Sequence, residues 1–369
     1  MSGHASGLQD AEAASGFSDL SDSEFLQIEE PEIGESRPLG CPILRHLDSQ
    51  GANMKERNWG TAKRKKAKTP LEAFHLHYLC VTDLSAQVWC EQEMVYHREQ
   101  PGQRLPEKKV VLNTGKSIHL ARELQDHDLV KVRTTSREDK WAIKLLNLLQ
   151  TIADLQEGRC ARECPVFGVL DDVFLVGIVD QLNYTAKGEL QLNELKTRER
   201  AYLPVPAQKR KDRFQVFLYK YLFDAMVQGS LTQDNFIHHL HLKPKQPLGP
   251  EIQEHAQKIG FTVCCFQDLL ELMVLNLTHS DIPAIDRLQI EYVHQQTDTL
   301  LGTEVITYDH DELMAMSHYF LTYWKGQRDP KGVDIEDTWK CCHCAFVDTC
   351  DWRLQTARSL VKKSSETKM

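Results

Sequence analysis

The chain has 369 residues, of which 41% are hydrophobic and 26% are charged, and this composition indicates a soluble globular protein with enough core for one large domain or two ordinary ones. It contains neither an uninterrupted apolar run near the ~20 residues that span a bilayer nor a signal peptide, so we expect no membrane insertion and no secretion. The formal net charge of −9 is local, because nine acids and no Lys or Arg lie within residues 1–35, which leaves the rest of the chain formally neutral and able to hold a basic groove. The absence of arginine before Arg37 argues against a mitochondrial transit peptide.

Residues 1–69 are predicted to form a disordered acidic tail followed by a basic linker. Within the tail, FSDLSDSEFLQIEE mixes phenylalanine and leucine with acids and serines. Two interpretations stay open: a docking segment that orders on binding a partner protein, or a disordered tail without such a role. The run KRKKAK at Lys63–Lys68 is compatible with a nuclear import signal and equally with a solvated linker. We therefore expect a nuclear protein, with the cytosol as the alternative.

Order is expected from Pro70 onward, in one domain over residues 70–355 that is followed by a flexible tail at 356–369. A Thr82/Asp83 cap, followed by apolar residues at roughly helical spacing, predicts the first helix of this domain. The predicted helix continues through Cys90.

Three further elements follow along the chain. Ser136 and Asp139 form a capping pair for a second helix, which is predicted to end at Gly158. Residues 173–197 are rich in aliphatic and β-branched side chains on either side of a Thr-Ala-Lys-Gly turn, and they predict a β-hairpin. Residues 212–229 predict a third helix that begins with an aspartate cap and ends with a glycine. Helices on both sides of a hairpin favour an α/β or α+β fold.

The hairpin carries two carboxylates and a lysine where its strands face each other. With the turn centred near residue 187, Asp180 lies opposite Glu194 at a Cβ separation of ~5 Å. Lys196 points to the same face as Glu194, and Leu195 between them points into the core. Two such carboxylates repel each other unless a cation lies between them, and their oxygen atoms suit Mg²⁺ or Mn²⁺, beside which a lysine can orient or deprotonate water. The alternative is an exposed ladder in which Lys196 only neutralises Glu194.

Asp180 and the triplet Glu194-x-Lys196 resemble the core motif of the PD-(D/E)XK nuclease superfamily. Gly177-x-x-Asp180 has the form found in its RecB-type branch, and Val179 stands where other members have a proline. The resemblance implies a restriction-endonuclease-like α/β fold with a mixed central sheet and flanking helices. It also implies that the two carboxylates hold Mg²⁺, with Mn²⁺ as the alternative, and that the lysine positions the attacking water.

Two further motifs of that branch flank the core in the same order. Gly115-x3-His119 precedes it, and the resemblance implies that this histidine is a third metal ligand. Gln215-x3-Tyr219 follows it, as an i,i+4 pair on one helix face, and these two side chains are implied to support the site and the bound strand.

Eleven cysteines without a secretory signal indicate a reducing compartment, in which clustered cysteines more often bind metal than form disulfides. Near the C-terminus, KCCHCAFVDTC places Cys341, Cys344 and Cys350 at C-x2-C-x5-C spacing. Three thiolates fall one short of the four ligands that a tetrahedral metal ion or a cubane cluster needs. From these residues alone, the site is either a zinc knuckle that uses Cys342 or His343, or a site completed from elsewhere in the chain.

A subfamily of RecB-type nucleases has one cysteine before the core and three after it at this spacing. The resemblance implies a [4Fe–4S] cluster held by Cys90, Cys341, Cys344 and Cys350, with Cys80 a buried thiol. Such a cluster would join the N- and C-terminal parts of the domain by closing a loop of about 250 residues, which is a large entropic constraint on the unfolded chain. Zinc is the competing metal. The remaining cysteines of the core are expected to be structural: Cys160, Cys164, Cys264 and Cys265.

Over residues 70–355 the chain resembles the exonuclease V family. The resemblance implies a monomeric Mg²⁺-dependent exonuclease that acts on single-stranded DNA, releases short oligonucleotides and takes part in DNA repair and genome maintenance. A single-strand-binding protein or another repair factor is a candidate partner of the N-terminal tail. A basic stretch is predicted to contact phosphates, or else to be a solubilising loop: Arg198, Arg200, Lys209, Arg210, Lys211 and Arg213.

Two alternatives stay open from the sequence. One is a structure-specific endonuclease, which the same motifs allow. The other is a non-catalytic DNA- or partner-binding module with a structural zinc site, which would need no alignment of Asp180, Glu194 and Lys196.

Overall fold

The computed structural model describes residues 68–100, 106–126 and 132–356. The predicted acidic tail, its basic run up to residue 67 and the predicted C-terminal tail from residue 357 lie outside the described residues.

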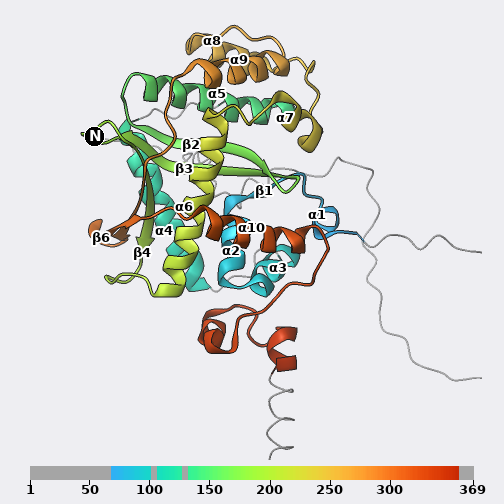
Figure 1. Ribbon diagram of the computed structural model, residues 1–369, viewed down its shortest axis with the longest axis vertical. Helices are drawn as coiled ribbons and strands as arrows, with labels where there is room; N and C mark the ends of the chain where they lie inside the picture. Colours follow the sequence, from blue (N-terminus) through green and yellow to red (C-terminus); the bar gives the residue numbers. More distant parts are fainter. Residues whose placement is uncertain (1–67, 101–105, 127–131, 357–369) are drawn as a thin grey trace, which may run out of the picture.

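A mixed β-sheet forms the centre of the protein (Figure 1). Its strands are β1 (Leu79–Cys80), β2 (Ala161–Leu170), β3 (Val173–Tyr184), β4 (Leu190–Arg198), β5 (Arg287–His294) and β6 (Thr299–Ile306). They lie in the order β1-β3-β4-β5-β6, and β2 pairs with β3. The β2–β3, β3–β4 and β5–β6 pairs are antiparallel, whereas β1 runs parallel to β3 and β4 runs parallel to β5. The predicted α/β fold with a mixed central sheet and flanking helices is therefore confirmed.

The helices that surround this sheet are α1 (Pro70–Ala73), α2 (Val81–Trp89), α3 (Glu91–Glu99), α4 (Pro106–Asp126), α5 (Arg137–Gln156), α6 (Pro206–Val227), α7 (Gln233–Leu240), α8 (Pro250–Lys258), α9 (Phe266–His279), α10 (His310–Trp324) and the 3-10 segment η2 (Ile335–His343). The long helix α6 packs across β2 to β5, and α5 packs between β2 and α9 (Figure 1). Among the described helices, none combines the length and the apolar character that crossing a membrane requires.

The two helices nearest the hairpin cover opposite faces of β4. Lys196 reaches Gln215 of α6, with 2.9 Å between Nζ and Oε1. The next strand residue, Thr197, lies directly against Gly115 of α4. Because successive side chains of a strand point to opposite faces, α6 lies on one side of β4 and α4 on the other.

The predicted hairpin and the second predicted helix are confirmed, together with the turn and the capping residues that were expected to bound them. Gln181 pairs with Asn193, which is the register expected from a turn centred near residue 187. In α5, Ser136 Oγ accepts from Asp139 N at 3.0 Å, and the Asp139 carboxylate accepts from Ser136 N at 3.2 Å. The helix is followed by Gly158 with a φ of 71°, a left-handed conformation that glycine adopts without strain.

Two helices begin earlier than predicted. The N-cap of α2 is Cys80, and the predicted Thr82/Asp83 cap lies inside the first turn, where Asp83 Oδ2 accepts from Cys80 N at 2.9 Å. The helix α6 begins at Pro206 instead of Asp212. Proline suits the first turn of a helix, because its fixed φ is helical and its missing N–H would have no partner there.

The environments of two cysteines also differ from the prediction. Cys90 lies between α2 and α3 in extended backbone, with φ −166° and ψ 116°, so the predicted single helix is two helices. Cys264 is exposed, whereas Cys164 is fully buried as expected of a structural thiol.

Candidate active site

The ladder between β3 and β4 opens at Asp180. The paired residues end at Gln181 and Asn193, and beyond this point β4 continues beside β5. Asp180 Oδ2 accepts a hydrogen bond from Leu195 N at 2.7 Å. In a continued ladder, a backbone carbonyl of β3 would accept this hydrogen bond instead. The carboxylate therefore satisfies a backbone donor that the separating strand leaves open. The opening holds Asp180 and Glu194 side by side without a ladder bond between them.

Glu194 and Lys196 belong to a chain of hydrogen bonds with α6. Lys196 Nζ donates to Glu194 Oε1 at 2.7 Å and to Gln215 Oε1 at 2.9 Å. Gln215 Nε2 donates to Glu194 Oε1 at 3.1 Å and to the Tyr219 hydroxyl at 2.8 Å. Gln215 and Tyr219 are one helical turn apart and buried, so one face of α6 holds the lysine and the glutamate in place. The structure thus brings these four predicted site residues together.

The charged groups of this cluster lie close enough to shift one another's pKa. Burial, opposed by the charge of Lys196, raises the pKa of Asp180. Burial and then the charge of Asp180 raise the pKa of Glu194. The pKa of Lys196 also lies above its usual range, because the carboxylates of Glu194, Asp212 and Asp180 outweigh the opposing effect of burial. The lysine is therefore an ammonium group that donates hydrogen bonds.

One carboxylate oxygen in the cluster lacks a partner. Glu194 is 3% exposed, and its Oε2 is buried with no hydrogen-bond partner among the described residues, while Oε1 accepts two hydrogen bonds. A buried carboxylate oxygen left unpaired is unfavourable. Glu194 and Asp180 line one pocket, and their oxygen atoms fit a hard cation such as Mg²⁺ or Mn²⁺.

His119 reaches the pocket from α4. Its Nδ1 lies 3.5 Å from Asp180 Oδ1. Gly115 is one turn earlier on the same helix face, and a Cβ at this position would lie only 2.8 Å from Thr197 Oγ1. The G-x3-H motif therefore combines a close approach of α4 to β4 with a histidine directed at the aspartate.

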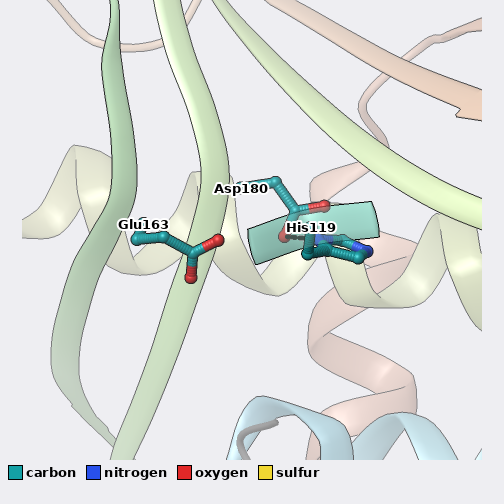
Figure 2. A group of neighbouring side chains, drawn as sticks. All are labelled: His119, Glu163 and Asp180. Carbon is teal, nitrogen blue, oxygen red and sulfur yellow. Dashed lines mark ion pairs between the residues drawn. The ribbon is translucent and has the colours of Figure 1, made fainter. Parts of the chain in front are cut away.

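Sequence reasoning missed Glu163, Arg122 and Arg162, which line the same pocket. Figure 2 shows Glu163 and Asp180 on neighbouring strands, with His119 beside them. The ligand atoms of these three residues all lie within 4.8 Å of one another. In the sequence, Glu163 is a single acid at the start of an apolar segment. Its neighbour on β3, Asp180, follows it by 17 positions, so no local motif joins the two residues.

The basic residues predicted to contact phosphates lie around the end of β4 and the start of α6, outside this pocket. Lys209 pairs with Glu304 at 2.8 Å, and Arg213 pairs with Glu312 at 2.5 Å. The basic residues among the described lining of the pocket are instead Arg122 and Arg162. Contact between DNA and the predicted basic stretch stays a prediction.

The cysteine-rich C-terminal segment folds back onto the corner between α2 and α3 (Figure 1). The rings of Trp89 and Trp339 meet edge to face with centroids 5.6 Å apart, and Phe346 lies 5.3 Å from Tyr96. Both contacts join residues more than two hundred positions apart, and they bring the corner residue Cys90 to the cysteines of the C-terminal segment.

The electrostatic environment groups the four predicted thiols. Burial is the largest cause that raises the pKa of Cys90 to about 12, and the nearby Cys344 and Cys350 thiols contribute to the same rise. Burial and then Cys350 raise the pKa of Cys341. Cys80, the other candidate for the fourth ligand, lies in β1 in the core of the sheet.

Four cysteine thiols are a donor set that suits either zinc or an iron–sulfur cluster, and the metal that they would bind stays a prediction. Cys342 and His343 are exposed.

Comparison with known proteins identifies the family of this chain. The chain matches the family described as Exonuclease V, a 5′ deoxyribonuclease, over residues 69–194, 186–271 and 253–353. It is 40% identical over 365 residues to Exonuclease V of Danio rerio, across 91% of this chain and 92% of that protein. The chain belongs to the exonuclease V family.

Membership of the exonuclease V family confirms the prediction of a deoxyribonuclease and excludes the non-catalytic binding module. A solved structure described as the crystal structure of SSO0001 matches at 13% identity and a TM-score of 0.33, over 75% of this chain and 87% of that chain, a similarity too low to support an argument.

Proposed function

We propose that this exonuclease V family member is a 5′ exonuclease specific for single-stranded DNA, with a PD-(D/E)XK site that uses Mg²⁺ or, as the alternative, Mn²⁺. The observation that carries the proposal is the buried, unpartnered Oε2 of Glu194 beside Asp180, at the point where β3 and β4 separate. A buried carboxylate oxygen without a partner calls for an explanation, and a cation bound between Glu194 and Asp180 would supply one.

The protein's own groups then have distinct tasks. Asp180, Glu194 and His119 would hold the metal, which would supply charge neutralisation at the phosphate and activation of water. Lys196, fixed by Glu194 and Gln215, presents an ammonium group to the phosphate or to the attacking water.

Two features of the pocket support a single strand as substrate. The close approach of α4 to β4 at Gly115 limits the room beside the carboxylates. Arg122 and Arg162 lie within the pocket, where they can bind phosphates that flank the scissile bond.

The proposal includes a [4Fe–4S] cluster on Cys90, Cys341, Cys344 and Cys350, whose role is structural. Cys344 Sγ accepts from Phe346 N at 3.4 Å, and hydrogen bonds of this kind are common around cluster sulfurs. The cluster would lock the corner of α2 and α3 to the C-terminal segment, and none of its cysteines is among the residues that line the pocket.

In the cell, we propose a monomeric enzyme that acts in DNA repair in the nucleus. The acidic tail would contact a single-strand-binding protein or another repair factor. The basic run KRKKAK would direct nuclear import.

End-labelled DNA tests this function. The full chain, purified without oxygen, is given linear single strands with free or blocked 5′ ends, circular single strands and duplexes, each with Mg²⁺ or with EDTA. We expect Mg²⁺-dependent release of short oligonucleotides from linear single strands with a free 5′ end. Cleavage of circular strands would instead establish the endonuclease alternative.

A matched pair of variants identifies the site in that assay. Asp180→Asn should reduce the rate at least about 10³-fold, a loss of the size seen when a key electrostatic group is removed. Asp286→Asn is the control, because the Asp286 carboxylate also accepts from a β4 backbone N–H, that of Leu190 at 2.9 Å, but lies outside the pocket. Full activity of the Asp180 variant would overturn the assignment.

A further inference from the structure

Asp212 of α6 lies one helical turn from the residue that holds Lys196. It precedes Gln215 by three positions, so the two side chains share one face of the helix. Gln215 accepts from Lys196 Nζ at 2.9 Å. Because α6 begins at Pro206, the Asp212 carboxylate does not cap the helix as the sequence suggested. It is half-buried and faces the sheet near the lysine instead.

Tyr292 of β5 holds the Asp212 carboxylate in this place. The tyrosine pairs in register with Lys196 of the parallel strand β4, so both side chains point to the face that α6 covers. Tyr292 is 1% exposed, and its hydroxyl donates to Asp212 Oδ2 at 3.2 Å. A buried tyrosine hydroxyl usually has such a partner. Two separate elements, β5 and α6, therefore bring a further carboxylate to the lysine.

The charge of Asp212 acts on Lys196. Although burial lowers the pKa of Lys196, the surrounding carboxylates raise this pKa above its usual range, and that of Glu194 contributes most. The carboxylate of Asp212 comes next, ahead of that of Asp180. Asp212 thus influences the lysine more than an aspartate of the core motif does.

We propose that Asp212, held by Tyr292, is a positioning residue for Lys196. This inference rests on the proposed nuclease function and adds one carboxylate to its site. The lysine is 23% exposed and donates to Glu194 and Gln215, while an ammonium group has three N–H donors. The charge of Asp212 balances the attraction of Glu194, so that the third N–H stays directed at the phosphate or the attacking water.

Hydrolysis of linear single-stranded DNA by the full chain tests this. Asp212→Asn removes the charge but keeps an oxygen that can accept from Tyr292. We expect kcat to fall by about 10–100-fold, the usual loss when a residue that orients an active-site group is changed. KM, and the affinity for single strands in EDTA, should stay within about twofold, because the effect reaches the reaction through Lys196. Asp212→Glu keeps the charge and should be more active than Asp212→Asn.

Two results of that assay would overturn the proposal. Full activity of Asp212→Asn would show that the charge has no role. A change confined to KM and DNA affinity would make Asp212 a part of the DNA-binding surface instead of a positioning residue.

Asp224→Asn is the matched control on the same helix. The Asp224 carboxylate accepts from Lys220 Nζ at 2.7 Å and from Ile285 N at 2.8 Å, and it lies outside the pocket. This variant should unfold at a lower urea concentration and keep its kcat, whereas Asp212→Asn should keep its unfolding midpoint and lose kcat. The same pattern in both variants would show that Asp212 only stabilises the helix.

A double-mutant cycle tests whether Tyr292 acts through Asp212. Tyr292→Phe keeps the buried ring and releases the carboxylate, so kcat should fall, though less than in Asp212→Asn. The double variant should have the kcat of Asp212→Asn alone, and losses that multiply would refute the coupling. Tyr308→Phe is the control, because this half-buried tyrosine also packs against α6, through Phe217, but its hydroxyl bonds to His310 at 3.2 Å. It should keep its kcat.

These outcomes separate the inference from the function it rests on. Natural protein that cleaves single strands with Mg²⁺, together with an unchanged kcat in Asp212→Asn, would refute the role of Asp212 and leave the nuclease site intact. Natural protein without nuclease activity would refute the proposed function and, with it, the task assigned to Lys196.

Discussion

Gly177 of β3 leaves room for the ring of Tyr219 on α6, because a Cβ at position 177 would lie 2.6 Å from Tyr219 Cε1. The tyrosine hydroxyl accepts from Gln215 at 2.8 Å, and Gln215 in turn accepts from Lys196 at 2.9 Å. The glycine of the G-x-x-D motif therefore admits the tyrosine that positions the glutamine and the lysine. The two motifs, which are far apart in the sequence, form one contact.

Gly177→Ala should therefore damage activity more than stability. Overpacking of this kind lowers the free energy of unfolding by about 1–3 kcal/mol. We expect in addition at least a tenfold loss of kcat on single-stranded DNA, because displacement of Tyr219 shifts Gln215 and Lys196. Urea denaturation and single-strand hydrolysis measure the two effects.

The matched control is Gly168→Ala. A Cβ at position 168 would lie 2.7 Å from Leu222 Cδ2, so this variant also forces a side chain of α6 to move, but an apolar one that takes no part in the hydrogen bonds of Lys196 and Gln215. It should lose similar stability and keep its kcat. Equal losses of activity in both variants would show that Gly177 acts through general packing.

Glu91 ties the corner of α2 and α3 to the C-terminal segment. It is 3% exposed and accepts from both terminal nitrogens of Arg328, at 2.5 and 2.6 Å, and from Lys331 N at 2.7 Å. Glu91→Ala removes the carboxylate that neutralises the largely buried guanidinium group, so the free energy of unfolding should fall by about 3–5 kcal/mol. Urea denaturation measures it.

Glu254→Ala is the control for this ion pair. Glu254 and Lys258 lie 2.9 Å apart on the surface of α8, where solvent screens their charges. We expect no measurable change in stability. A loss equal to that of Glu91→Ala would contradict the importance of burial for the Glu91 pair.

The cysteine assignment predicts which variants lose iron. Cys90→Ala and Cys344→Ala should yield colourless, iron-poor protein with reduced stability, whereas Cys80→Ala and Cys342→Ala should retain the brown colour and the iron. Absorption spectra and iron analysis of protein purified without oxygen decide this. One stoichiometric zinc in colourless natural protein would refute the cluster.

Asp139 links stability to pH away from the catalytic site. Although burial raises the pKa of this carboxyl, hydrogen bonds from Gly249 N and from Thr135 and Ser136 lower it below its ordinary 3.8. Because the folded pKa is depressed, the carboxylate stabilises the protein above pH 3.8, and this contribution disappears as the pH falls through the folded pKa.

Asp139→Asn should therefore lower the free energy of unfolding by about 1–3 kcal/mol at pH 7, because buried backbone donors lose a charged acceptor. The difference from the natural protein should shrink below about pH 4. Urea denaturation at several pH values measures it, and a difference that grows on acidification would show that the sign is wrong.

Local signals were sufficient for several elements. The capping pair Ser136 and Asp139 specifies the start of α5, and the alternation of strand side chains with one turn specifies that Asp180 faces Glu194. Local signals gave the wrong start for α6, because Pro206 and Asp212 can both begin a helix and the helix begins at the earlier residue.

The sequence by itself determined the chemical groups of the hairpin and their register, because these depend on residues close together in the chain and on the two-residue period of a strand. It also determined which thiols are available for a cluster. Only the tertiary structure decided that Cys90 lies at a corner facing the C-terminal segment, that Gly177 and Tyr219 touch, and that Glu163 faces Asp180. Each of these depends on packing between separate elements, which local propensities do not encode.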